Sequence, residues 1–149
     1  IDKMVLEDVD GIYGNLVYVA KNDKNKVFRT WISSQFSPEK LNMGWMPPHP
    51  TLFIKKSWYD RLEGFDDSYR ISADYKFVLE LFSSKDFTST HLSRIVTLMS
   101  VGGVSNNSFK NIICKMKEDW NALEVISSGS LSRCMTLGMK NLSKIKQFF

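Results

Sequence analysis

Residues 44–57, GWMPPHPTLFIKKS, hold three of the four prolines of the chain within four consecutive positions. Proline fixes φ and has no backbone N–H to donate, so residues 45–50 predict a stiff loop that joins neither a helix nor a sheet. The apolar run at 51–54 predicts a short buried strand. Ser57 is then expected to cap a helix that ends at Gly64.

Upstream of this loop, the sequence predicts two paired strands and a short helix. β-Branched and aromatic residues are concentrated in 11–20 and in 27–32, and the polar residues 21–25 between them are typical of a turn. We therefore expect a hairpin or an adjacent pair of strands. Residues 37–42, SPEKLN, begin with a capping serine and a proline, which predicts a helix that stops at Gly44.

Downstream of the loop, a further strand and three more helices are expected. Ser72 is placed to cap a helix whose apolar side chains recur every three or four residues, at Tyr75, Val78, Leu79 and Phe82. A strand is expected at 90–100, a helix from Asn106 or Asn107 to about Ser127, and a last helix from Ser130 toward Phe149. This order predicts an α/β fold (a mixed α+β sheet) with a C-terminal helical pair.

The composition is that of one soluble domain in a reducing compartment. Of the 149 residues, 43% are hydrophobic, which is enough to bury a core, and the apolar runs are too short to span a bilayer. The two cysteines, Cys114 and Cys134, lack the spacing of a zinc or redox motif. We therefore expect a cytoplasmic location. The whole net charge of +4 is carried by residues 110–149.

Residues 44–57, followed by Gly64-Phe65-Asp66 and by Tyr69-Arg70-Ile71-Ser72-Ala73-Asp74-Tyr75, resemble the second half of the bacterial family 2 glycosyltransferases. Three further stretches agree with this family in order, at 13–18, 102–106 and 140–148. The resemblance implies a GT-A type fold, a nucleotide-diphosphate sugar as donor, inversion at the anomeric carbon and usually a divalent metal, Mg²⁺ or Mn²⁺.

The part of that family which holds the donor and the metal lies upstream of the residues matched here. We therefore expect a fragment, with residues 1–105 as the acceptor-side half of a GT-A domain and residues 106–149 as a helical extension. Asp8-Val9-Asp10 matches the residue types of the family's acidic motif but not its place in the chain. We expect it to be a solvated connection from a helix to the strand at 11–20. No replacement metal ligands are expected in this chain.

Asp74 is the residue that the resemblance assigns to catalysis. Inverting transfer needs a base that takes the proton of the acceptor hydroxyl, and in the family the aspartate at this position does so. The alternative is that Asp74, in the first turn after Ser72, only complements the helix dipole. Asp66 and Asp67 are expected to organise the turn after Gly64.

Four further residues are candidates for substrate binding. His49 stands in the stiff loop, where an imidazole could contact donor phosphate, acceptor or metal. Trp45, Tyr69 and Arg70 could form a sugar-stacking face and an anion contact beside Asp74. The alternative for the aromatic residues is core packing, and for His49 an ordinary packed or exposed position.

The last helix, 130–149, is amphipathic. On a helical wheel, Leu131, Met135, Leu142, Ile145 and Phe149 share one side, and Arg133, Lys140 and Lys144 share the opposite one. Such helices commonly dock on their own protein. The alternative is peripheral contact with an anionic membrane, which would suit a lipid-linked acceptor.

The expected function is therefore sugar transfer to a saccharide or lipid-linked acceptor in bacterial cell-surface polysaccharide synthesis. A non-catalytic basic module that binds a membrane or a partner, from a truncated gene, is the alternative. Binding of nucleic acid is not expected, because the positive charge is confined to the helical end.

Overall fold

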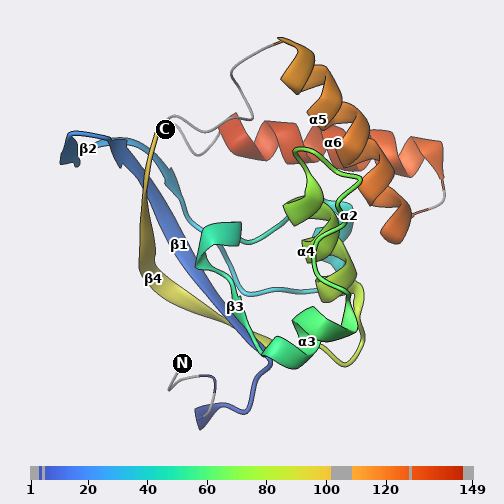
Figure 1. Cartoon of the computed structure of the whole chain (residues 1–149), viewed down its shortest axis with the longest axis horizontal. Coiled ribbons are helices and arrows are strands. Elements are labelled where there is room, and N and C mark those ends of the chain that lie inside the picture. The colour runs from blue at the N-terminus through green and yellow to red at the C-terminus, as the bar shows by residue number, and fades with distance from the viewer. Residues whose placement is uncertain (1–3, 5, 102–108, 128, 146–149) are drawn as a thin grey trace.

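The computed structural model describes residue 4 and residues 6–101, 109–127 and 129–145, and it is a mixed α/β fold with a four-stranded sheet (Figure 1). The strands are β1 (Gly11–Ala20), β2 (Asp23–Trp31), β3 (Phe53–Ile54) and β4 (Ser89–Ser100). The α-helices are α2 (Glu39–Asn42), α3 (Lys56–Arg61), α4 (Ala73–Ser83), α5 (Phe109–Ala122) and α6 (Ser130–Ile145), with short 3₁₀ turns at His49–Thr51 and Leu123–Val125.

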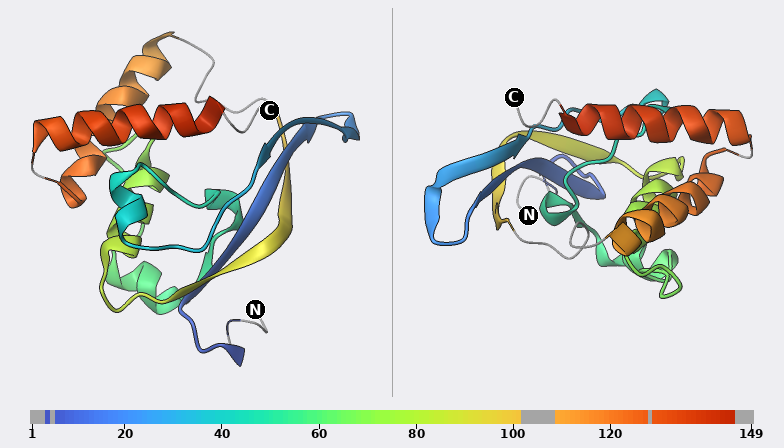
Figure 2. Two further views of the ribbon diagram at one scale, coloured as in Figure 1. Left: turned by 180° about the vertical axis from the view of Figure 1, so that it is seen from behind. Right: turned by 90° about the horizontal axis from the view of Figure 1, so that it is seen from above.

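Strand β1 is the centre of the sheet. One of its edges is paired along nearly its whole length with β4, in parallel. The other edge is shared by two antiparallel partners, β3 opposite Gly11 and Ile12 and β2 opposite residues 16–20. The chain between β1 and β4 crosses over one face of the sheet, so that the helices lie to one side of it (Figure 2).

Helix α4 is the centre of the hydrophobic core. Its side chains Tyr75, Phe77, Val78, Leu79, Leu81 and Phe82 are all buried. They pack with Tyr13 of β1, with Trp58 of α3, and with Ala122 and Leu123 at the end of α5. The helical pair α5–α6 therefore shares one core with the sheet and α4.

Most of the predicted elements are confirmed. Strand β1 has the predicted bounds, β1 and β2 form the predicted hairpin, and α6 begins at Ser130. Gly44 ends α2 with a φ of +72°, a conformation that favours glycine. The predicted caps Asn106 and Asn107 lie outside the described residues, and the helix predicted to reach Ser127 ends at Ala122.

The segment around the proline loop differs from its prediction. His49–Thr51 forms a 3₁₀ turn, because Thr51 Oγ1 and its backbone N–H both donate to the carbonyl of Pro48, at 2.7 and 2.8 Å. The strand that follows has only two residues, and Phe53 is 50% exposed rather than buried. Ser57 lies inside α3 and does not cap it.

Helix α6 docks with the face opposite to the one that its helical wheel predicts. Leu131, Met135 and Leu142 are 76%, 60% and 63% exposed, whereas Lys140 is 3% exposed. Thr136, also buried, donates to the carbonyl oxygen of Asn42 at 2.8 Å. The prediction that α6 docks on the protein through its apolar side is therefore wrong. The side chains of Lys144, Ile145 and Phe149 lie outside the described part of the chain.

Candidate functional site

Asp74 lies in the first turn of α4 and is partly buried. Its Oδ1 accepts a hydrogen bond from the backbone N–H of Tyr75 at 2.7 Å. Three other carboxylates of α4 and α5 are held by cations or by backbone amides: Glu80, Glu118 and Asp119. No cation pairs with Asp74 among the residues that the structure describes. Its carboxylate can therefore accept a proton, or a hydrogen bond from a hydroxyl group.

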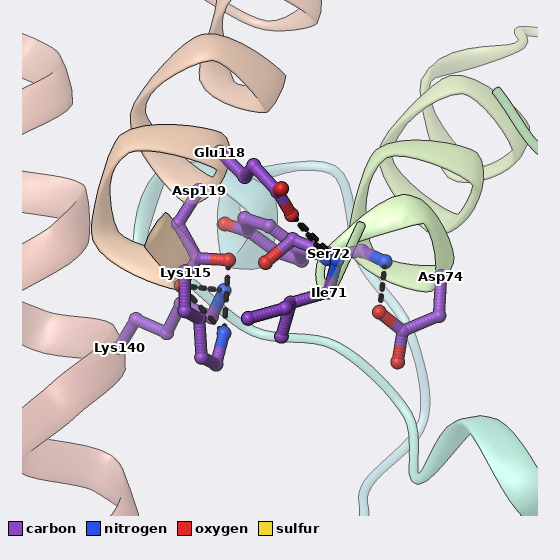
Figure 3. Close-up of polar contacts among 8 residues, drawn as sticks. Ile71, Ser72, Asp74, Lys115, Glu118, Asp119 and Lys140 are labelled. Atoms are coloured by element: carbon purple, nitrogen blue, oxygen red, sulfur yellow. Dashed lines mark hydrogen bonds and ion pairs between the residues drawn. The ribbon is translucent and has the colours of Figure 1, made fainter. Parts of the chain in front are cut away.

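Glu118 of α5 organises the chain just before α4. One carboxylate oxygen accepts from the backbone N–H of Arg70 at 2.9 Å, and the other accepts from those of Ile71 at 2.8 Å and Ser72 at 2.7 Å (Figure 3). Burial acts to raise the pKa of Glu118, but these amide hydrogen bonds outweigh it and the net shift is downward. Glu118 thus stabilises the N-terminus of α4 in place of the expected serine cap.

Ser72 does not act as that cap. It stands at the N-cap position, but its hydroxyl makes no hydrogen bond to the helix, and Oγ is buried without a partner among the described residues. A carboxylate near a helix N-terminus complements the helix dipole. Asp74 also accepts from a backbone N–H of this first turn, so the dipole alternative for Asp74 stays open beside the catalytic one.

His49 is linked to α4 through a chain of aromatic contacts. The ring centroids of His49 and Phe65 are 5.6 Å apart, and those of Phe65 and Phe77 are 5.2 Å apart. Phe77 is three residues after Asp74 on α4, and residues at this spacing are neighbours on a helix surface. His49 Nδ1 is buried and makes no hydrogen bond to any described residue, so it is available to a ligand or an unobserved neighbour.

Tyr69 and Arg70 lie in the segment just before α4. Tyr69 is partly buried, with the ammonium of Lys76 5.5 Å from its ring centroid, and Arg70 is exposed. Lys76 also binds Asp66 at 2.6 Å and so holds the pKa of Asp66 down, at about 2. Asp66 therefore organises the turn, as predicted, through Lys76 and Ser68.

Trp45 is separated from this group. Its indole packs edge-on against the rings of Tyr13 and Phe82, at 5.7 and 5.3 Å between centroids, and also contacts Phe36. Phe82 is eight residues after Asp74, which corresponds to about 12 Å along the helix. The structure therefore has Tyr69 and Arg70 just before the helix that carries Asp74, links His49 to that helix through Phe65, and packs Trp45 against the core.

Sequence reasoning missed a buried ion pair behind α4. Lys140 of α6 lies 2.9 Å from Asp119 of α5, and their side chains are only 4% and 5% exposed. The Lys140 ammonium also stands 3.0 Å from the ring centroid of Tyr75, and Lys115 reaches Asp119 at 2.8 Å. In Figure 3 this cluster lies apart from Asp74. Tyr75, Asp119 and Lys140 are distant in sequence, and only Lys115 and Asp119 are joined by a local pattern, the four-residue spacing on a helix.

The described residues do not fit a divalent metal. Among them, no group of three histidine, cysteine, aspartate or glutamate side chains is arranged to hold an ion. Asp8 is exposed, as predicted for a solvated connection, but Asp10 is not solvated. The carboxylate of Asp10 is bound by Lys55 at 3.0 Å and by the hydroxyl of Thr88 at 2.9 Å.

Comparison with protein-family models, with curated proteins and with solved structures finds no match to this chain. The resemblance to family 2 glycosyltransferases therefore stays a prediction. In the described part of the chain, no helix has the length and apolar character needed to cross a bilayer.

Replacing Glu118 with glutamine is expected to destabilise the fold by about 1–3 kcal/mol at pH 7, because three amides lose a charged acceptor. The folded-state pKa of Glu118 lies below its ordinary value of 4.5. Its contribution is therefore complete above that value and is lost as the pH falls through the folded-state pKa. Urea unfolding of both proteins at a series of pH values measures this.

The matched control is Glu124→Gln, which removes a carboxylate that is 64% exposed and pairs with Arg133. We expect a change of at most about 0.5–1 kcal/mol for this exposed pair. If Glu118→Gln and Glu124→Gln cost the same, or if the Glu118 effect persists unchanged at pH 3, Glu118 does not hold the start of α4 through its charge.

Proposed function

We propose that this chain is the acceptor-side part of an inverting glycosyltransferase that uses a nucleotide-diphosphate sugar. Its fold would be part of a GT-A domain, and its acceptor would be a saccharide or a lipid-linked sugar of bacterial cell-surface polysaccharide synthesis. The observation that carries the proposal is Asp74, a partly exposed carboxylate in the first turn of α4 without a cation partner in the described chain, with Tyr69 and Arg70 just before it in sequence. The quoted motif supports the same assignment.

In the proposed reaction, Asp74 accepts the proton of the acceptor hydroxyl while the hydroxyl oxygen attacks the anomeric carbon. The new glycosidic bond forms as the bond from that carbon to the nucleoside diphosphate breaks, and the diphosphate leaves with the electron pair. The exposed Arg70 would contact an anionic group of the donor or acceptor, and Tyr69 would contact a sugar face. A divalent metal, if bound, would be held by residues outside the described chain and would neutralise the leaving diphosphate.

The proposal is tested with the longer protein that joins this chain to a nucleotide-binding half. Radiolabelled nucleotide sugars would be supplied with saccharide and prenyl-phosphate-linked acceptors, and the anomeric configuration of the product would be read by NMR. We expect an inverted product. The chain alone should bind no donor in calorimetry. Failure of transfer with every donor, or tight metal-dependent donor binding by the chain alone, would contradict the proposal.

One observation favours the second candidate, a module that binds a membrane surface. The apolar side of α6, with Leu131, Met135 and Leu142, faces outward and could lie in a lipid interface. However, Lys140 is buried on Asp119, and Arg133 is bound to Glu124, so these cations are directed at the protein. Sedimentation with anionic and neutral vesicles distinguishes this candidate, which requires binding without any transfer activity.

A further inference from the structure

A groove of about 580 Å³ lies between the end of β2, the segment after α2, and α6. Its size falls within the range of small-molecule sites. Its walls are mainly apolar and are made by Trp31, Ile32, Met43, Met46, Met139 and Leu142. Ile32, Met43 and Leu142 are all more than half exposed, so the groove is open to a ligand from outside.

The same groove contains an unpaired hydroxyl. Ser33 is 8% exposed, and its Oγ has no hydrogen-bond partner among the described residues. Its backbone N–H donates to Asn15 Oδ1 at 2.9 Å, which fixes the residue in place. A buried hydroxyl without a partner costs free energy. A ligand with an acceptor atom at this point would remove that cost.

A cation lines the groove as well. Lys40 Nζ donates to Ser34 Oγ at 2.9 Å and to the carbonyl oxygen of Gln35. A lysine ammonium has three donors, so one remains for a ligand. Both groups that accept from Lys40 are neutral, and they belong to Ser34 and Gln35, the two residues that follow Ser33. The groove therefore combines a mainly apolar surface with two hydrogen-bond donors, the ammonium of Lys40 and the hydroxyl of Ser33.

We propose that this groove binds an amphiphile with a single apolar chain and an anionic phosphate head group. The chain lies on the methionine, tryptophan and leucine side chains, and the phosphate accepts from Ser33 Oγ and Lys40 Nζ. Charge-assisted hydrogen bonds of this kind are stronger than neutral ones. Lys140, which also lines the groove, contacts the ring of Tyr75, the residue after Asp74. Binding in this groove does not depend on the transferase proposal.

The test is a titration of the whole chain with decyl phosphate below its micelle concentration, followed by tryptophan fluorescence, since Trp31 and Trp45 line the groove. We expect saturable binding. Octyl phosphate should bind about tenfold more weakly, because two buried methylene groups are lost. Decyltrimethylammonium has the same chain with a cationic head and should not bind. Inorganic phosphate, which lacks the chain, should not bind either.

Ser33→Ala should weaken decyl phosphate binding about tenfold without lowering the unfolding temperature, since Ser33 Oγ has no internal hydrogen bond to lose. Ser143→Trp places a large side chain at the groove and should abolish binding. Ser132→Trp is the matched control, because Ser132 is exposed on the same helix but does not line the groove, and it should bind normally.

Three results would overturn the inference. They are equal binding of the cationic amphiphile, no saturable signal with decyl phosphate, and binding that Ser143→Trp and Ser33→Ala both leave unchanged. Sedimentation velocity covers a further outcome. A dimer that Ser143→Trp dissociates, without any response to decyl phosphate, would assign the groove to a second copy of the chain. Loss of sugar transfer in the longer protein has no bearing on these results.

Discussion

Replacing Asp74 with asparagine is expected to lower the rate of sugar transfer by about 10²–10⁴ in the protein that contains this chain, the range of a lost general base. Asparagine keeps the Oδ1 that accepts from the N–H of Tyr75, so the first turn of α4 should be preserved. The Michaelis constant of the donor should stay nearly unchanged, because the substitution removes a group that acts in the transition state. Steady-state kinetics with varied donor measures both quantities.

Asp67→Asn is the control, since Asp67 is an exposed carboxylate of the preceding loop and should have little effect. Near-normal turnover in Asp74→Asn would end its assignment as the base. A large loss of turnover in Asp67→Asn would instead move the assignment to Asp67 rather than to Asp66. Hydrogen bonds from Lys76 and Ser68 hold the pKa of Asp66 at about 2, which makes it a weak proton acceptor.

Asp119→Asn is expected to destabilise the fold by about 3–5 kcal/mol, because it leaves the buried ammonium of Lys140 without its anionic partner. Burial alone would raise the pKa of Asp119, but the charges of Lys140 and Lys115 outweigh it and lower the pKa. For a chain of this size, each kcal/mol lowers the unfolding temperature by about 2–4 °C. The unfolding temperature should therefore fall by about 6–20 °C.

The double variant Asp119→Leu, Lys140→Met separates the charge effect from packing. Replacing both members of a buried pair by apolar side chains is often nearly neutral, so the double variant should be much more stable than Asp119→Asn. Lys115 is 26% exposed and can turn toward solvent. A double variant as unstable as the single one would mean that the pair contributes shape rather than charge compensation.

Local patterns predict the elements of this fold well. The β-branched and aromatic residues of Gly11–Ala20 mark β1 with its observed bounds, and the three- and four-residue spacing in α4 marks the helix that forms the core. Such signals depend on neighbouring residues alone. The mixed α/β class followed from the order of the elements, while the GT-A assignment followed from a resemblance and is a proposal.

Partners that are distant in sequence explain what local patterns missed. The chain before α4 is held by Glu118, about 46 residues after Ser72, so the expected serine cap was wrong. The helical wheel of α6 separates the apolar from the basic side chains, but it takes no account of residues on other helices. Asp119 of α5 binds Lys140 and so turns the polar side of α6 toward the protein interior. Trp45 stands in a loop sequence typical of a site, yet its ring contacts are with core residues.

The parallel pairing of β1 with β4 has a consequence for the order of folding. The β1–β2 hairpin is closed by a short turn and can form early, whereas β4 pairs with β1 across 78 positions, as the pairing of Gly11 with Ser89 shows. The entropy of closing so long a loop delays this pairing. Until β4 arrives, the long edge of β1 is an open template for other strands, and during synthesis on the ribosome the nascent chain is exposed to misassembly over this interval.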